Sequence, residues 1–204
     1  MWNWRRERSL KMATKRFKNI HIETLSKQWA TLEKVTFDYQ MADGRWVEQK
    51  RESYNRGDGA VILLFNKRKK TVILTKQFRI PTYFNGNEDG FMIEACAGML
   101  DRDHPRECII REVEEETGYR ITKAEKVFEL FSTPGAVTEK LYYFIGEYDD
   151  SMKVSSGGGL DEENEDIEVL ELPFQKAMDM MFSGEIEDAK TVILLQYLQN
   201  KNLL

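Results

Sequence analysis

Apolar and polar residues alternate between Thr31 and Tyr54, and two shorter apolar runs follow. The alternating segment is interrupted by the turn-like sequence Ala42–Arg45, so it predicts a β-hairpin. The runs 60–65 and 71–74 are joined by the basic turn 66–70 and do not alternate, which predicts a second hairpin whose strands are buried on both faces. Further strands are expected at 91–94, 126–131, 141–147 and 167–172, and a loop at 82–90.

Three segments have the periodicity of helices. The amphipathic stretch from Pro105 to Thr117 begins with proline, which suits the first helical position, and precedes Gly118, which suits a C-cap. Two further helices are expected at 174–182 and 188–199. Because strands outnumber helices and do not alternate regularly with them, the pattern predicts an α+β protein or an α/β sandwich rather than a βαβ series.

Composition narrows the classes of function. The 204 residues fit one domain, or one domain with a small appendage, and 41% of them are hydrophobic. No apolar run approaches the roughly 20 residues of a membrane span, so we expect no membrane partner. The formal charge of −5 argues against nucleic acid as a partner. Two cysteines cannot form a disulfide framework, which indicates a reducing compartment, and we expect a cytoplasmic protein.

The first nineteen residues differ in charge from the rest, with seven basic residues against the single acid Glu7. A solvated, frayed tail over residues 1–19 is the favoured interpretation, and an arm for a membrane surface or nucleic acid is the alternative. Met12 offers an internal start, so residues 1–11 are predicted to be dispensable.

The predicted helix at 105–117 carries the most informative chemistry. Glu112, Glu115 and Glu116 stand at i, i+3 and i+4, so three carboxylates share one helix face. Like charges at this spacing repel, and a hard divalent cation with oxygen ligands, such as Mg²⁺, would offset the repulsion. Arg111 can pair with Glu115 one turn on. The alternative is a solvated acidic face without a ligand.

The stretch from Gly98 to Tyr119 resembles the Nudix box, in which Gly, five residues, Glu and seven residues precede Arg-Glu-apolar-x-Glu-Glu-x-Gly-apolar. The matching residues are Gly98, Arg111, Glu112, Val113, Glu115, Glu116, Gly118 and Tyr119. This chain departs from the pattern in two ways. The interval from Gly98 to Arg111 is one residue short, and Asp103 and His104 stand where the family has its first glutamate. Either of these two residues could cap the helix.

The resemblance covers most of the chain and is closest to the bacterial GDP-mannose pyrophosphatases. The segments that carry it are 50–52, 54–59, 76–79, 85–87, 94–98, 134–139 and 165–174. It implies a Nudix α/β/α sandwich with a mixed sheet and a small N-terminal β-hairpin element. That element, residues 20–56, would cross to the partner in a homodimer, and residues 57–204 would form the Nudix hydrolase domain.

The resemblance also implies roles for individual residues. The Mg²⁺ ligands would be the Ala97 carbonyl, Glu112, Glu116 and Glu165. The catalytic carboxylates would be Glu112, Glu115, Glu116, Glu139 and Glu165. A nucleotide-sugar would meet Trp29, Arg79, Ala97, Gly98, Met99, Glu116, Glu139, Asn164, Glu165 and Lys190 of one subunit, and Lys50, Arg51 and Glu52 of the other.

Some of these roles can be weighed on chemistry alone. A pyrophosphate is negatively charged on both phosphoryl groups, so its hydrolysis needs cations, which Mg²⁺ and Arg79 can supply. Glu139 and Glu165 are candidates for orienting or deprotonating the attacking water, with Glu165 preferred as ligand or base. The alternatives are a plain loop acid for Glu139, a surface ion pair for Arg79 and a core or interface residue for Trp29.

Two other features have simpler interpretations. The segment Ser155–Gly159 could cradle a phosphate, but no Lys-Ser/Thr follows it and the acidic stretch Asp161–Glu171 does, so a hinge that delivers acids is favoured. Neither Cys96 nor Cys108 has a histidine nearby in sequence, which argues against thiol catalysis.

Three functions therefore follow from the sequence. The first is Mg²⁺-dependent hydrolysis of GDP-mannose to GMP and mannose 1-phosphate. The second keeps the mechanism with ADP-ribose or another nucleoside-diphosphate sugar as substrate, because the box recognises the diphosphate and not the base. The third is a non-catalytic module that binds a nucleotide-sugar as a regulatory ligand, against which the complete carboxylate set argues.

Overall fold

The computed structural model describes residues 15–100, 104–160, 162 and 164–204. The dispensable segment expected at 1–11, the candidate cap Asp103, and the acids Asp161 and Glu163 lie outside the described residues. The chain divides into two compact units, Met1–Arg56 with Gly135–Thr138, and Gly57–Pro134 with Glu139–Leu204.

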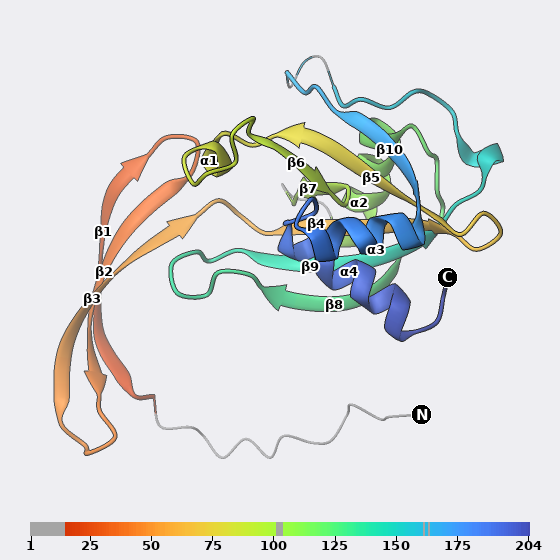
Figure 1. The fold of residues 1–204 in the computed structure, drawn as a ribbon. Helices are drawn as coiled ribbons and strands as arrows, with labels where there is room; N and C mark the ends of the chain where they lie inside the picture. Colours follow the sequence, from red (N-terminus) through yellow and green to blue (C-terminus); the bar gives the residue numbers. More distant parts are fainter. Residues whose placement is uncertain (1–14, 101–103, 161, 163) are drawn as a thin grey trace. The chain divides into compact units, whose positions relative to one another are not determined.

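The N-terminal unit contains one antiparallel sheet with the strand order β1-β2-β3 (Figure 1). Its strands are β1 Phe17–Lys27, β2 Thr31–Gln40 and β3 Trp46–Asn55. The predicted hairpin is confirmed as β2 and β3, and Gly44 in its turn has a φ of 90°. Strand β1 was not expected, and it begins inside the segment interpreted as a tail. All eleven of its residues are exposed, so it has no alternation of buried and exposed positions.

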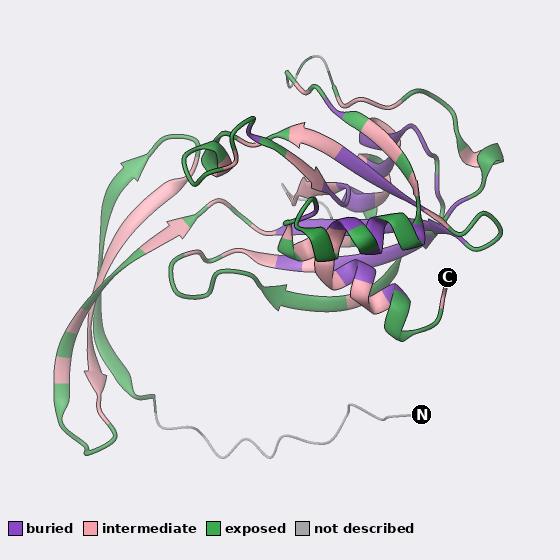
Figure 2. Cartoon of the chain, viewed as in Figure 1, coloured by how far each residue is buried: buried purple, intermediate pink, exposed green. Residues whose placement is uncertain are grey.

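This sheet has no core of its own. None of the described residues 15–56 is buried, and Figure 2 shows only exposed and intermediate residues along its three strands. Several large apolar side chains are at least 40% exposed: Phe17, Ile20, Ile22, Leu25, Trp29 and Trp46. An exposed apolar set of this kind is typical of a surface that contacts another protein segment.

The second unit is built on a mixed sheet with the order β10-β5-β4-β9-β8, in which β6 also pairs with β5 and β7 with β4. The pairing of β4 with β9 is parallel and the other pairings are antiparallel. The strands are β4 Gly59–Asn66, β5 Thr71–Phe78, β6 Phe91–Glu94, β7 Ala97–Met99, β8 Glu125–Phe131, β9 Lys140–Glu147 and β10 Glu168–Pro173. Apart from β7, each of them was expected from the apolar pattern.

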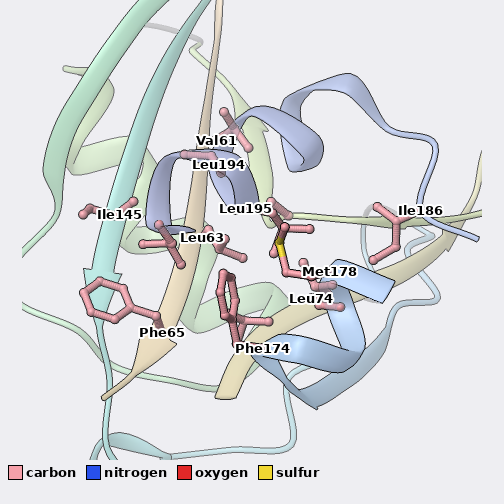
Figure 3. Packing of buried hydrophobic residues seen from close by; sticks show 14 of the residues in the cluster. Val61, Leu63, Phe65, Leu74, Ile145, Phe174, Met178, Ile186, Leu194 and Leu195 are labelled. Atoms are coloured by element: carbon pink, nitrogen blue, oxygen red, sulfur yellow. The ribbon is translucent and has the colours of Figure 1, made fainter. Parts of the chain in front are cut away.

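Helices cover both faces of this sheet, and the α/β/α sandwich is confirmed. All eight residues of β4 are buried. Its side chains Val61, Leu63 and Phe65 pack with α3 Phe174–Ser183 and α4 Ala189–Asn200 in one core (Figure 3). Its side chains Ala60, Ile62 and Leu64 pack with the α2 residue Ile109 in the other core. Strand β4 therefore fixes the two helical layers against one sheet.

The helix with the carboxylates differs from the expected α-helix over 105–117. Helix α2 spans Pro105–Glu112, and the chain then continues as a π-helical turn over Val113–Thr117. Gly118 ends this turn with a φ of 75°, as the sequence predicted for a C-cap. The single turn of α1, Ile80–Tyr83, lies at the start of the expected loop, and a 3₁₀ turn spans Asp150–Met152. Within the described ranges, no helix has the length and apolar character needed to span a membrane.

Candidate active site

The carboxylate helix is anchored at its start and along one face. The His104 side chain accepts a hydrogen bond from the backbone N–H of Arg106, which confirms a capping role for this histidine. Cys108 and Ile109 are fully buried. Cys108 and Glu112, four residues apart, share the helix face that meets β7, where the Cys108 thiol contacts both the Met99 carbonyl and Glu112. Glu112 lies directly on Gly98, because a Cβ added at Gly98 would come within 2.3 Å of the Glu112 carboxyl carbon. Glycine is therefore required at this position of β7.

Glu116 is the most perturbed carboxylate of the site. It is only 4% exposed, and its Oε2 atom has no hydrogen-bond partner. Its pKa is raised to about 8, chiefly by burial and also by the charges of Glu112 and Glu165, although a hydrogen bond from the Cys96 thiol and the charge of Arg79 act to lower it. Without a cation, this carboxyl is held mostly protonated at neutral pH.

Glu115 has a different environment from its two neighbours. Its carboxylate accepts a hydrogen bond of 2.8 Å from Arg111 Nη1, which confirms the predicted pairing one turn apart. Arg111 Nη2 also lies 3.0 Å from Glu112 Oε1. Arg111 thus joins Glu112 and Glu115 at the edge of the site and leaves Glu116 as the buried acid.

The glycine segment connects the helix to Glu165. The N–H of Gly158 donates to the Glu116 carbonyl at 2.9 Å, and the N–H of Gly159 donates to the Glu115 carbonyl at 3.1 Å. These donors cap the end of the π-helical turn, so they are not free to cradle a phosphate. The next N–H, that of Leu160, donates to Glu165 Oε2 at 3.1 Å. The charge of Glu165 raises the pKa of Glu116, so the two carboxylates are close. The segment after the glycines thus places an acid near the carboxylate helix, in agreement with the prediction of a hinge.

The arrangement fits a hard divalent cation. Glu116 Oε2 is buried without a partner, and Glu112 and Glu165 are close enough to repel its charge. Ionising Glu116 therefore costs free energy unless a cation binds there. No group of three His, Cys, Asp or Glu side chains within the described ranges forms a ready-made ligand cluster. A cation would therefore need a backbone oxygen as well. The Ala97 carbonyl is the candidate, because Ala97 precedes Gly98 in β7 and Gly98 is in close contact with Glu112.

A second cluster of charges lies at the ends of β5, β6 and α4. Arg79 Nε donates to Glu94 Oε2 at 2.6 Å, and Lys190 Nζ donates to Glu94 Oε1 at 2.5 Å. Asp188, the N-cap of α4, also accepts from Lys190 at 2.7 Å. The structure thus brings together two residues implied as substrate contacts, Arg79 and Lys190. Glu94, which lies between them, was not among the predicted site residues, and its only signal in the sequence is an acid at the end of an apolar strand, before the Ala-Cys-Ala-Gly segment.

Three other candidates lie in the same unit. Glu139 directly precedes β9, is partly buried, and has its Oε1 atom 3.9 Å from the position of a Cβ on Gly59. Met99 ends β7, and its carbonyl accepts from the Cys108 thiol at 3.3 Å. Asn164 is exposed and has a φ of 55°.

The remaining candidates belong to the N-terminal unit. Trp29 lies in the turn between β1 and β2, is 70% exposed, and has the Arg56 guanidinium 5.3 Å from its ring centre. A core position for Trp29 is therefore wrong. Lys50, Arg51 and Glu52 are exposed on β3, where Lys50 lies 3.2 Å from Glu48.

The sequence also matches known families and proteins. Residues 16–54 match the family described as the GDP-mannose pyrophosphatase NudK N-terminal domain, and residues 55–193 match the NUDIX domain. A GDP-mannose pyrophosphatase of Klebsiella pneumoniae is 52% identical over 189 residues, which cover 91% of this chain and 94% of that protein. A GDP-mannose pyrophosphatase of Escherichia coli K12 is 51% identical over 185 residues, which cover 91% and 96% of the two chains.

Among solved structures, an ADP compounds hydrolase superposes with a TM-score of 0.66 at 17% identity, and the match covers 91% of this chain and 96% of that one. At this identity the likeness concerns the fold alone. The NUDIX match, by contrast, spans more than half of the chain and includes the carboxylate helix, the glycine segment and both cations that hold Glu94. The chain belongs to the Nudix family.

Proposed function

We propose that this protein hydrolyses the pyrophosphate bond of GDP-mannose to give GMP and mannose 1-phosphate, with Mg²⁺ as cofactor. The observation that carries the proposal is the buried Glu116, whose Oε2 atom has no hydrogen-bond partner and whose pKa is raised by the nearby charges of Glu112 and Glu165. A module that only binds a ligand gains nothing from this costly arrangement. The relatives named GDP-mannose pyrophosphatase, about half identical over nearly the whole chain, favour this substrate.

The metal ligands in this proposal are the Ala97 carbonyl, Glu112, Glu116 and Glu165. Bound Mg²⁺ supplies positive charge for the pyrophosphate and lowers the pKa of a coordinated water. Oxygen donors of this kind suit Mg²⁺, which binds a few carboxylates and fills its other positions with water and substrate phosphate. Nudix hydrolases in general use such divalent metals.

The protein side chains would bind and orient the other reactants. Arg79 and Lys190 carry the positive charges suited to the phosphoryl oxygens. Glu139 and Glu165 are the candidates for holding or deprotonating the attacking water, and Glu165 is preferred because its charge already acts on Glu116. Glu115 would act through Arg111 by orienting it beside Glu112.

We further propose that residues 20–56 serve as a dimerisation element for the Nudix domain at 57–204, and that Lys50, Arg51 and Glu52 act on the partner subunit's substrate. The coreless sheet with its exposed apolar side chains supports this assembly. Light scattering at micromolar concentration tests it, and a monomer would overturn it. The free cysteines Cys96 and Cys108 support a cytoplasmic location.

The substrate is tested by comparing kcat/KM for GDP-mannose, GDP-glucose, ADP-ribose and UDP-sugars in the presence of Mg²⁺. We expect GDP-mannose to be the preferred substrate, with GMP and mannose 1-phosphate as the products and no turnover in EDTA. Equal or faster hydrolysis of ADP-ribose would overturn the choice of substrate. Tight binding of GDP-mannose without hydrolysis at any metal concentration would instead indicate a regulatory module.

A further inference from the structure

Glu94 occupies an unusual place for an acid, at the end of β6 and 5% exposed. Its two carboxylate oxygens are both used, one by Arg79 Nε and the other by Lys190 Nζ. These cations come from segments 15 and 96 residues away in sequence. One buried carboxylate therefore fixes two side chains that local structure could not bring together.

The two cations differ in how far they reach solvent. The Arg79 side chain is 41% exposed, whereas that of Lys190 is 17% exposed and is also held by Asp188. Arg79 contacts Glu94 through Nε, which is one of the five N–H donors of a guanidinium. Its charge also acts on Glu116. Arg79 therefore binds the buried acid Glu94 and is close enough to Glu116 for its charge to lower the pKa of that carboxyl.

The chain continues directly from Glu94 into the other parts of the site. The backbone N–H of Ala95 donates to Thr191 Oγ1 at 2.7 Å, which ties β6 to the first turn of α4. Cys96 follows, and its thiol donates a hydrogen bond to Glu116. Two residues further on, Gly98 lies in close contact with the Glu112 carboxylate. A displacement of Glu94 would therefore change the positions of both Arg79 and Lys190 and of the groups that contact Glu112 and Glu116.

We infer that Glu94 is a positioning residue, which orients Arg79 and Lys190 so that both cations present their charge to the diphosphate of the substrate. The inference rests on the proposed function and adds to it a residue that need not touch the substrate itself. Long basic side chains lose considerable rotamer entropy when they bind, and a carboxylate that holds them beforehand reduces this loss.

The test begins with Glu94→Gln in the full chain. A glutamine replaces one of the two acceptor oxygens by a donating NH₂ group, which would face the N–H donors of Arg79 or Lys190. We expect the dissociation constant of metal-free protein for GDP-mannose to rise about tenfold, the size expected for a lost charge-assisted hydrogen bond. In the presence of Mg²⁺, KM should rise by a similar factor and kcat should change less.

Three comparisons separate positioning from general stability. Glu171→Gln is the matched control. Glu171 lies on β10, which like β6 pairs with β5, and it accepts hydrogen bonds from Lys69, Thr71 and Tyr148, so its replacement should leave KM unchanged. Glu94→Asp keeps the carboxylate and should restore part of the binding. In an Arg79→Ala background, Glu94→Gln should have a much smaller effect than in the wild type, because the two residues act together.

The possible failures are distinguishable. Unchanged binding in Glu94→Gln, or fully additive effects with Arg79→Ala, would overturn the positioning role. Failure of the wild type to hydrolyse GDP-mannose would overturn the proposed function, and the same variants are then compared for binding of inorganic pyrophosphate, which needs only the cations. No loss of pyrophosphate binding in Glu94→Gln would overturn the role of Glu94 as well. Thermal unfolding checks each variant, and Glu94→Asp carries the test if the glutamine variant does not fold.

Discussion

Replacement of Glu116 by glutamine should abolish Mg²⁺-dependent turnover and, in the absence of metal, make the folded protein more stable at alkaline pH. The carboxyl is 4% exposed and its pKa is raised from 4.5 to about 8 by burial and by the charges of Glu112 and Glu165. Glutamine resembles the protonated carboxyl in shape and carries no charge. The variant therefore keeps the neutral form of the side chain at every pH.

The sign of the pH dependence follows from proton binding. Between pH 4.5 and about 8 the folded wild type keeps the Glu116 proton, whereas the unfolded chain has lost it. The unfolding free energy of the wild type therefore falls by about 1.4 kcal/mol for each pH unit in this window, or about 5 kcal/mol over the whole window. The stability difference between Glu116→Gln and the wild type should grow by this amount from pH 4.5 to 8.

The assay is urea unfolding in EDTA at several pH values, together with turnover of GDP-mannose in Mg²⁺. Glu114→Gln is the control on the same turn, because Arg120 lowers the pKa of Glu114 and gives no alkaline dependence. Added Mg²⁺ should raise the stability of the wild type and not that of Glu116→Gln. A stability difference that is flat from pH 5 to 8, or normal turnover in the variant, would refute the reasoning.

Three further predictions concern the supports of the site. Gly98→Ala should place its Cβ within 2.3 Å of Glu112, displace that carboxylate, and weaken metal binding measured by calorimetry; unchanged affinity would contradict the close contact. Gly118→Ala should lower the unfolding free energy by about 1 to 2 kcal/mol for the left-handed backbone alone, and by more because its Cβ would lie 2.3 Å from the Ser155 carbonyl; the Tm reports this. Burial opposes ionisation of Glu94, but Lys190 and Arg79 lower its pKa below 4.5 on balance, so the stability that this carboxylate adds should be lost as pH falls through its folded pKa; acid titration of Glu94→Gln should lack this part of the loss.

Much of the fold follows from local rules. The apolar runs around Val61 and Val72 predicted two strands buried on both faces, and the structure buries them between two helical layers. Pro105 and Gly118 marked the start and end of the carboxylate helix because each has backbone preferences that few other residues share. These signals are visible in sequence because they depend on near neighbours or on repeated burial.

The features that were missed depend on distant contacts. Strand β1 is exposed along its whole length and has no period of burial to detect. The π-helical turn has the same sequence pattern as an α-helix, and its geometry depends on donors from Gly158 and Gly159. Glu94 could not be recognised because its partner Lys190 is 96 residues away. The pairing of Arg111 with Glu115 was predicted from their spacing, but the burial of Glu116, which sets it apart from Glu112 and Glu115, was not.

The π-helical turn makes the length of the segment Val113–Thr117 critical. A π-turn accommodates one residue more than an α-turn, and each α-helical residue rotates the chain by about 100°. Deletion of one residue here would let the turn relax to an α-helix and would swing Glu116 out of its buried position relative to Glu112. A chain shortened at this point would keep the buried strands of the sandwich and lose the geometry of the carboxylates. The number of residues between Glu112 and Gly118 is thus part of the site, not a variable loop length.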